Sequence, residues 1–447
     1  MKLALLPIDN RPVCYTLPQL ISQIDESIEL FIPERKFLGD LKRSANIEEL
    51  FKWLENLPSE LNAIVLSLDT ITYGGLIPSR RGVETFDELK SRIEKLKEIL
   101  LNKKCKIYAF SSIMRISNNN YNEEEKQYWA QYGKKIFQYS YDLHKTGKSD
   151  TFGIPEDILE DYLKTRNRNF EINKIYLQWQ KQGLFDTLVF SKDDCAQYGL
   201  NVAESQELEK LGAVTKTGAD EIPLTLMARA ITENIRICPI FLEPEYKNLI
   251  SNYEDISIEK SVKNQIELAG CELSDETSAD IILYVNNFKT NQGEIVMKKD
   301  TQPFNKTFIP PQKNYMIADV RFANGSDNAF IKEFFKNDID IKTFYGYSAW
   351  NTSANTLGSL ICAAKVKFLA KQYSEKAFKL LQLIRFADDW GYQANVRQEL
   401  TSPDIKELNE KMKPFEKNIK KRLNIEMGNI KYNYPWNRLF EVEIELN

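Results

Sequence analysis

The sequence predicts an α/β fold with a largely parallel sheet, of the (β/α)8 barrel type, that carries a helical insertion and a helical C-terminal extension. Short apolar runs alternate with amphipathic segments over residues 2–360, and several of these runs end at a carboxylate or an amide. Alternating strands and helices are typical of parallel sheets. About eight to ten strands are expected, a number that also fits two doubly wound α/β domains.

Strands are expected where β-branched and aromatic residues gather in short apolar runs. These runs cover residues 3–8, 30–34, 63–68, 106–111, 188–192, 213–217, 237–242, 281–285, 316–320, 342–347 and 442–446. Pro33 places the second run at a sheet edge, because proline has no N–H to donate to a ladder.

Helices are expected where apolar residues recur with the helical period. These segments cover residues 17–27, 47–57, 86–102, 123–144, 155–181, 203–211, 222–234, 261–269 and 329–336. The segment 118–182 is longer than an ordinary βα loop, so we expect it to form a helical cap over the site. Residues 1–360 are then the catalytic domain, and 361–447 its helical, charged extension.

Composition restricts the class of protein. The chain has 447 residues with 43% hydrophobic and 11% aromatic content, which is ample for a packed core. A formal charge of −4 provides no basic field for nucleic acid. The sequence shows neither a leader-like N-terminus nor an apolar run of membrane-spanning length, so we expect a cytoplasmic protein without a membrane partner.

The chemistry open to the chain is limited by its histidine content. His144 is the one histidine, and it lies in a polar stretch read as a helix end on the surface. Serine or cysteine triads and common zinc sites need histidines, so they are disfavoured. The six cysteines show no CxxC spacing, as expected for reduced thiols. Carboxylate chemistry remains, without a cofactor or, as the alternative, with oxygen-bound Mg²⁺ or Mn²⁺.

The apolar run from Leu188 to Phe190 stops at the adjacent acids Asp193 and Asp194. Other apolar runs end in the same way, at Asp9, Asp69, Asp319 and the Trp350-Asn351 step. Active sites of parallel α/β folds lie at the carboxyl ends of strands. The repeated pattern therefore predicts one polar site that is assembled from several strand ends.

Asp193 and Asp194 are the predicted catalytic pair. Two neighbouring acids in a partly buried cleft cannot both ionise at low cost, so the pKa of one should rise, as a general acid requires. The competing interpretation is an N-cap of the following helix, which would account for one acid only.

Substrate binding is predicted for polar and aromatic residues near other strand ends. They are Asp9, Arg11, Asp69, Tyr73, Arg80, Arg115, Asp220, Glu221, Asp319, Asn324, Asp327, Trp350, Asn351 and Asn355. Each has a structural alternative: an Asp9–Arg11 ion pair, helix-dipole pairing for Asp220 and Glu221, core packing for Trp350. Turn chemistry equally suits Asn324, Asp327 and the neighbouring Asn328.

Six motifs in order carry a resemblance to a known family. They are Asp9-Asn10-Arg11-Pro12; Asp69 with Tyr73-Gly74-Gly75-Leu76 and Ser79-Arg80; Asp193-Asp194 with Tyr198-Gly199; Gly218-Ala219-Asp220-Glu221; Asn324-Gly325 with Asp327-Asn328; and Trp350-Asn351-Thr352 with Asn355-Thr356-Leu357-Gly358. Through them the chain resembles, nearly end to end, the bacterial domain of unknown function 4127 family. That family name implies no activity, so it groups the residues without assigning them a role.

Three functions fit these observations. The first is a glycoside hydrolase, because the Asp-Asp step looks like that of substrate-assisted β-N-acetylhexosaminidases, where the first acid orients the acetamido group and the second is the acid/base. The second is a hydrolase or isomerase of a small polar metabolite, with Asp9, Asp69, Asp193 and Asp319 binding Mg²⁺ or Mn²⁺. The third is a sugar-binding protein without turnover. The expected partner of the first is a small carbohydrate.

Overall fold

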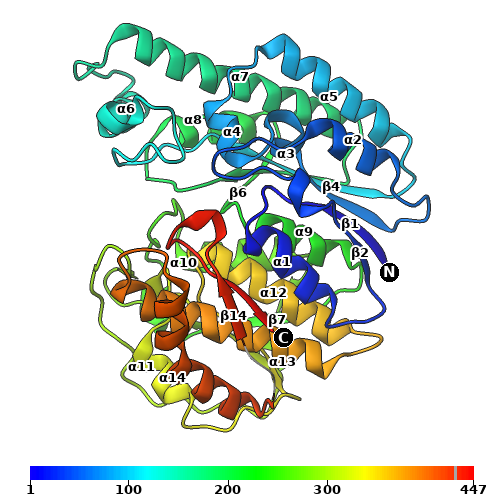
Figure 1. Cartoon of the computed structure of the whole chain (residues 1–447), viewed down its shortest axis with the longest axis vertical. Coiled ribbons are helices and arrows are strands. Elements are labelled where there is room, and N and C mark those ends of the chain that lie inside the picture. The colour runs from blue at the N-terminus through cyan, green and yellow to red at the C-terminus, as the bar shows by residue number, and fades with distance from the viewer. Residues whose placement is uncertain (427–429, 447) are drawn as a thin grey trace. The chain divides into compact units, whose positions relative to one another are not determined.

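The computed structural model describes residues 1–426 and 430–446, and it divides into two compact units (Figure 1). Unit 1 comprises Met1–Tyr15, Glu29–Leu226 and Tyr253–Asp255. Unit 2 comprises Thr16–Ile28, Met227–Asn252 and the chain from Ile256 onward. Each unit contains a parallel sheet and helices, which confirms the mixed α/β class. Residues 427–429 and Asn447 of the expected extension lie outside the described residues.

Unit 1 is built on a six-stranded parallel sheet in the order β2-β1-β3-β4-β5-β6. Its strands are β1 (Lys2–Leu6), β2 (Glu29–Phe31), β3 (Ala63–Ser67), β4 (Lys106–Ile113), β5 (Thr187–Lys192) and β6 (Val214–Thr217). The short strand β2 lies at an edge, as the following Pro33 predicts. The strand order reverses direction between β1 and β3, which is where open α/β sheets form a ligand crevice.

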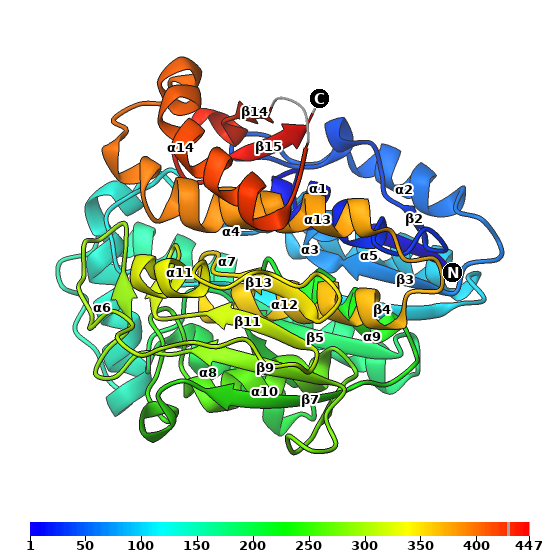
Figure 2. The same ribbon diagram turned by 90° about the horizontal axis from the view of Figure 1, so that it is seen from below.

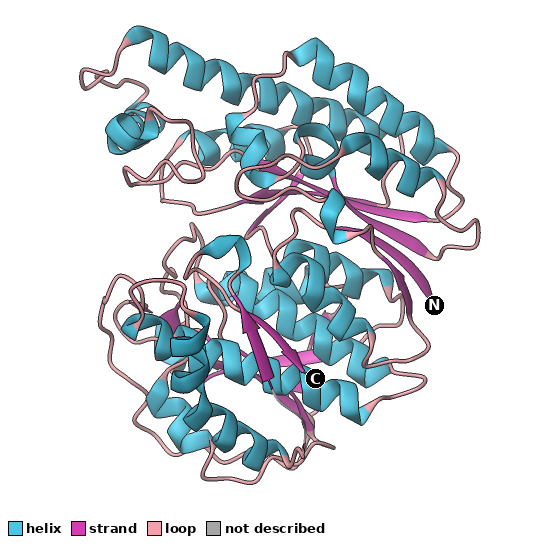
Figure 3. Cartoon of the chain, viewed as in Figure 1, coloured by secondary structure: helices cyan, strands magenta, loops and turns pink. Residues whose placement is uncertain are grey.

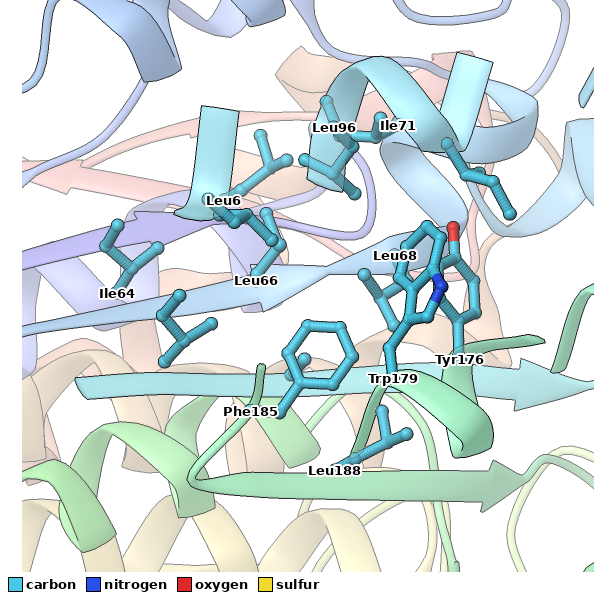
Figure 4. Packing of buried hydrophobic residues seen from close by; sticks show 14 of the residues in the cluster. Leu6, Ile64, Leu66, Leu68, Ile71, Leu96, Tyr176, Trp179, Phe185 and Leu188 are labelled. Atoms are coloured by element: carbon cyan, nitrogen blue, oxygen red, sulfur yellow. The ribbon is translucent and has the colours of Figure 1, made fainter. Parts of the chain in front are cut away.

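Helices cover this sheet through one large apolar cluster (Figures 3 and 4). The helices of unit 1 are α2 (Ile47–Glu55), α3 (Leu68–Tyr73), α4 (Leu76–Arg81), α5 (Phe86–Leu101), α6 (Trp129–Thr146), α7 (Glu156–Lys181) and α8 (Leu200–Lys210). All five residues of β3 are buried, as expected for a strand covered on both faces. Leu66 of β3 packs in the same cluster as Leu96 of α5 and Trp179 of α7.

Local signals set the helix boundaries. Helix α5 begins with a capping box, in which Thr85 and Glu88 bond reciprocally, and α2 begins at the side-chain cap of Asn46. Helix α1 (Pro12–Ser22) starts earlier than the expected residue 17, because proline suits the first helical position. Helix α3 starts at once after β3, so the strand expected to reach residue 68 ends at Ser67.

The expected helical insertion contains α6 and α7. A smaller apolar cluster, with Met114, Trp129, Ile136 and Tyr162 among its members, fills the space between them and the end of β4. Helix α6 begins at Trp129 and not at the expected residue 123, because the preceding acids turn toward arginine side chains described below. The insertion therefore has its own core.

Unit 2 contains a five-stranded parallel sheet in the order β13-β11-β9-β7-β8 (Figure 2). Its strands are β7 (Arg236–Phe241), β8 (Glu272–Leu273), β9 (Ile281–Asn286), β11 (Tyr315–Asp319) and β13 (Phe344–Ser348). Two-stranded pairs form from β10 (Gly293–Glu294) with β12 (Phe322–Ala323), and from β14 (Ile430–Asn433) with β15 (Glu443–Leu446). The strand order reverses between β7 and β9, as it does between β1 and β3 in unit 1.

The helices of unit 2 follow the sequence pattern closely. They are α10 (Ile258–Leu268), α11 (Asn328–Phe334), α12 (Ser353–Leu369), α13 (Glu375–Arg385) and α14 (Ile405–Leu423), while α9 (Ile222–Ala230) spans the point where the chain leaves unit 1. Directly after α13 the chain forms a π-helix, η3 (Phe386–Gln393). Within the described residues, no helix is both long and apolar enough to traverse a bilayer.

We expect Leu66→Ala to lower the free energy of unfolding by about 3 kcal/mol, because a fully buried leucine leaves a cavity when truncated. Urea unfolding followed by circular dichroism measures the change. Leu101→Ala, at the exposed end of α5, is the matched control and should cost less than about 0.5 kcal/mol. Equal losses for both variants would show that the cluster in Figure 4 is not a rigid core.

Candidate active site

The carboxyl edge of the unit 1 sheet collects most of the predicted polar residues. Because all its strands are parallel, the residues that follow them emerge at the same edge. These residues are Asp9 after β1, Asp69 after β3, Arg115 after β4, Asp193 and Asp194 after β5, and Asp220 after β6. Unit 1 therefore brings together the predicted residues that follow its own strands, whereas Asp319 and the Trp350-Asn351 step follow strands of the separate sheet in unit 2.

Two arginines hold the predicted catalytic pair. Arg80 Nη2 donates to Asp193 Oδ2 at 3.0 Å, and Arg115 Nη1 lies 3.0 Å from Asp194 Oδ2 and 3.5 Å from Asp193 Oδ2. The two carboxylates thus share one guanidinium nitrogen. Neither aspartate caps the next helix, because the N-cap of α8 is Gly199, whose backbone N–H donates to His144 Nδ1. The structure overturns the N-cap interpretation of this pair.

Two further acids complete the cluster around these arginines. Glu124 Oε2 lies 2.8 Å from Arg115 Nη2, and Glu125 Oε1 lies 3.1 Å from Arg115 Nε. Both glutamates also lie within 3.6 Å of Arg80 Nη1. Four carboxylates therefore surround two guanidiniums, and negative charge is in excess. Burial alone would lower the pKa of Arg115, but the surrounding carboxylates raise it well above its ordinary value.

Asp194 is the acid of this cluster that is most open to solvent. Its side chain is 34% exposed, against 21% for Asp193 and 1% for Arg80. Its pKa is raised, first by desolvation and then by the neighbouring charge of Asp193, while Arg115 opposes the shift. The backbone of Asp194 is left-handed, with φ of +45°, a conformation that Asp tolerates better than most residues.

Asp69 lies fully buried beside the cluster, in the first turn of α3. Its Oδ2 accepts the backbone N–H of Ser112 at 2.8 Å, and Oδ1 has no hydrogen-bond partner among the described residues. Desolvation raises the pKa of Asp69 to about 7, against the smaller lowering effects of Ser112 and Arg80. Tyr73 is buried nearby, and burial together with the charge of Asp69 raises the pKa of its phenol.

Arg11 forms an ion pair with Asp9, which is one of the two roles that the sequence analysis considers for it. Its Nε donates to Asp9 Oδ2 at 2.8 Å, and its two terminal nitrogens form a fork on the carboxylate of Asp220. All three side chains are nearly buried. A bidentate fork of this kind fixes both partners geometrically. The sites after β1 and β6 are thereby joined, and a substrate-binding role for these residues remains a prediction.

Gly218 allows the turn from β6 toward Asp220 and Glu221. Its φ is +111°, and a Cβ at this position would lie 1.8 Å from Glu221 Oε1. Glu221 Oε2 accepts the backbone N–H of Ala219 at 3.1 Å, so its carboxylate is folded back over the turn. The tight turn thus depends on glycine, and Glu221 has a local structural role.

The short segment Tyr253–Asp255, which follows the first strand of unit 2 in sequence, also belongs to unit 1. Lys192 Nζ donates to Asp255 Oδ2 at 2.5 Å, and Thr217 Oγ1 donates to Asp255 Oδ1 at 2.9 Å. Asp255 therefore bridges the ends of β5 and β6. Cys195, which follows the aspartate pair, has its pKa raised well above the ordinary value by burial, which argues against an activated thiolate.

The predicted residues in unit 2 form a different kind of network. Asp319 is fully buried: Oδ1 accepts from Asn286 at 2.8 Å, and Oδ2 accepts from the Asp327 N–H at 2.8 Å and the Tyr347 hydroxyl at 3.0 Å. Asp327 caps α11 through Ala329 N, as turn chemistry predicts. Protein donors thus engage both oxygens of Asp319, and burial raises its pKa.

The other unit 2 candidates also make structural contacts. Asn324 has a left-handed backbone and donates to Glu294 Oε1 at 2.6 Å. Trp350 is buried with its ring edge-on to Phe440, which matches the core-packing interpretation. Asn351 also has a left-handed backbone, and Asn355 is buried near the start of α12. Their roles in substrate binding stay predictions.

The sequence reasoning missed several charged residues that are buried or half-buried. Glu124 and Glu125 sat in a run expected to start a helix, although their position shortly after Arg115 was a usable signal. In unit 2, Asp388 and Asp389 form a second adjacent pair inside the π-helix, where Arg385 pairs with Asp389. Helical surroundings concealed that pair, since the sequence pattern that predicts a site places its acids at strand ends.

His144 lies in the last turn of α6, and its Nδ1 accepts the backbone N–H of Gly199 at 3.1 Å. No cluster of three or more His, Cys, Asp or Glu side chains arranged for a metal ion occurs within residues 1–426 and 430–446.

The family model described as "Protein of unknown function (DUF4127)" matches residues 3–445. The chain therefore belongs to the DUF4127 family, which the six motifs predicted. No curated protein and no solved structure gave a match.

Asp69→Asn should gain stability relative to the wild type as pH rises from about 4 to 7. Because folding raises the pKa of Asp69, the residue does not lower the free energy of unfolding at pH values below the unfolded-state pKa of 3.8. Above that pH the destabilisation grows until the pH passes about 7. The full cost is up to about 4 kcal/mol. Urea unfolding at pH steps measures the difference, with the exposed Asp157→Asn as control. A difference that is constant with pH would contradict the prediction.

Gly218→Ala should lower the free energy of unfolding by about 3 kcal/mol, because it adds a steric clash to backbone strain. Gly212→Ala is a matched control, since Gly212 has φ of +92° but open space around it, and strain alone should cost about 1 kcal/mol. Thermal and urea unfolding measure both variants. Similar losses at the two positions would contradict a role for Glu221 in closing the turn.

Proposed function

We propose that this protein is a glycoside hydrolase in which Asp194 is the general acid/base. The observation that carries the proposal is the state of the Asp194 carboxyl, which is one-third exposed, has a raised pKa and lies beside a second carboxylate on a shared arginine. A general acid must keep its proton near neutral pH and reach the substrate. Asp194 combines these two properties.

Asp193 is proposed to orient the nucleophilic group of an N-acetylated sugar. Two guanidiniums bind its Oδ2, so its position is more tightly fixed than that of Asp194, whose one cationic partner among the described residues is Arg115. In this mechanism the acetamido oxygen attacks the anomeric carbon while Asp194 gives its proton to the departing oxygen. Water then opens the cyclic intermediate, and Asp194 takes back a proton. Arg80 and Arg115 position the pair.

The other predicted contacts are assigned supporting roles. We propose that Asp9, Asp69 and Asp220 shape the polar floor of the site, since they follow strands β1, β3 and β6 at the same carboxyl edge of one sheet. For the finer architecture, the alternatives are a (β/α)8 barrel and two doubly wound domains. We propose the second, which the two separate strand orders support. A cytoplasmic location and a small carbohydrate partner belong to the same proposal.

Asp194→Asn should lower kcat at least about 100-fold on aryl glycosides with poor leaving groups, because proton donation to the departing oxygen is lost. The same variant should lose far less on a dinitrophenyl glycoside, whose leaving group needs little protonation. Hydrolysis is measured against a panel of neutral, N-acetylated and uronic acid glycosides, with and without EDTA. The melting temperature should stay near that of the wild type.

Asp157→Asn, an exposed acid in the first turn of α7, is the control and should keep full activity. Equal losses of Asp194→Asn on good and poor leaving groups would remove Asp194 from the acid role. Activity that EDTA abolishes and Mg²⁺ or Mn²⁺ restores would favour the metal-dependent hydrolase or isomerase. The absence of hydrolysis across the panel would reject the proposal.

A further inference from the structure

Unit 1 contains a cavity of about 590 Å³, and none of the candidate site residues lines it. It lies between the segment that joins α4 to α5, one face of α7, and Lys126. Its lining residues are Gly82, Val83, Glu84, Thr85, Phe86, Lys126, Asp161, Lys164, Thr165, Asn167, Arg168 and Glu171. The volume falls in the range of small-molecule sites.

The apolar part of the lining comes from Val83 and Phe86. Val83 lines the cavity, and its hydrophobic side chain is 91% exposed to solvent. Phe86 is half-buried at the first position of α5. An apolar rim on a polar surface is favourable to a ligand with an apolar body, because binding removes that surface from water.

The charges of the lining are unevenly paired. Each acid has a cation: Lys126 Nζ lies 2.7 Å from Asp161 Oδ2, Arg92 Nη1 lies 3.7 Å from Glu84 Oε1, and Lys174 Nζ lies 3.0 Å from Glu171 Oε1. Among the cations of the lining, Lys164 is the one whose side chain forms no ion pair or hydrogen bond with any described residue. The lining therefore offers one cation for an anionic ligand group.

The cavity wall is tied to the cluster of arginines and acids. Arg168 donates to the carbonyl oxygens of Gly82 at 3.0 Å and Glu84 at 2.7 Å through Nη1, and to that of Ser79 at 3.2 Å through Nη2. These carbonyls lie on both sides of Arg80, which binds Asp193. A ligand that rests on Arg168 and the segment 82–86 would therefore touch the same backbone that positions Arg80.

We propose that this cavity is a second ligand site, which binds a small amphipathic anion with an apolar ring and one carboxylate or sulfonate. Val83 and Phe86 contact the ring, and Lys164 pairs with the anionic group. The site does not depend on glycosidase activity. Its position against the ends of α4 makes it a place from which a metabolite acts on Arg80.

The test compares naphthalene-1-sulfonate with 1-naphthylmethylammonium, which share a ring system and differ in charge. Isothermal titration calorimetry of the full chain should show binding of the sulfonate and at least tenfold weaker binding of the ammonium. Lys164→Glu should weaken the sulfonate at least tenfold and strengthen the ammonium. Lys104→Glu, the same charge change at an exposed position before β4, should leave both affinities unchanged.

Hydrogen exchange by mass spectrometry locates the bound probe. Protection in the segments 82–86 and 161–171 on adding the sulfonate is expected, and protection elsewhere would overturn the proposal. Equal affinity for the two probes, or equal effects of Lys164→Glu and Lys104→Glu, would also overturn it. These readouts need no turnover, so they can fail or succeed independently of the glycosidase proposal.

Discussion

The polar edge of unit 1 depends on one constraint, which is that a charge removed from water must find an opposite charge. Arg80 is almost completely buried, and isolated burial of a guanidinium would cost several kcal/mol. Asp193, Glu124 and Glu125 supply the compensating charges from two different parts of the chain. The segment between β4 and α6 is therefore arranged by the ion pairs that its glutamates form with the arginines, and not by regular secondary structure.

The same strand-then-acid pattern leads to two different outcomes. In unit 1, Asp194 keeps an exposed face and Asp69 keeps an oxygen without a partner among the described residues. In unit 2, donors from Asn286, Tyr347 and a backbone amide engage both oxygens of Asp319. Closed hydrogen-bond networks specify and rigidify a fold, whereas incompletely satisfied acids are typical of reactive sites. This contrast supports the choice of Asp194, and not Asp319, as the general acid of the proposed function.

Periodicity was enough to predict most elements, because it is local. The apolar spacing predicts α5 nearly to its observed limits, where the structure adds the capping box of Thr85 and Glu88, and β5 follows from its apolar run. Partner choice is not local. Asp220 pairs with Arg11, 209 positions away in the sequence, and the sequence alone left that pair open. Helix starts were misplaced where a tertiary charge pair competed with the helix, as it does ahead of Trp129.

The division of the chain has a consequence for its synthesis. Residues 16–28 belong to unit 2, where the amides of Lys371 and Gln372 donate to the Asp25 carboxylate and Thr16 bonds to Glu443. A ribosome that adds about 5–20 residues per second needs roughly 15–70 s to travel from Asp25 to Lys371. During that interval this early segment is without its native partners. Unit 2 therefore completes its fold only after Glu443 has been made, and a truncation that removes Lys371 and the residues after it also acts on helix α1, which is made much earlier.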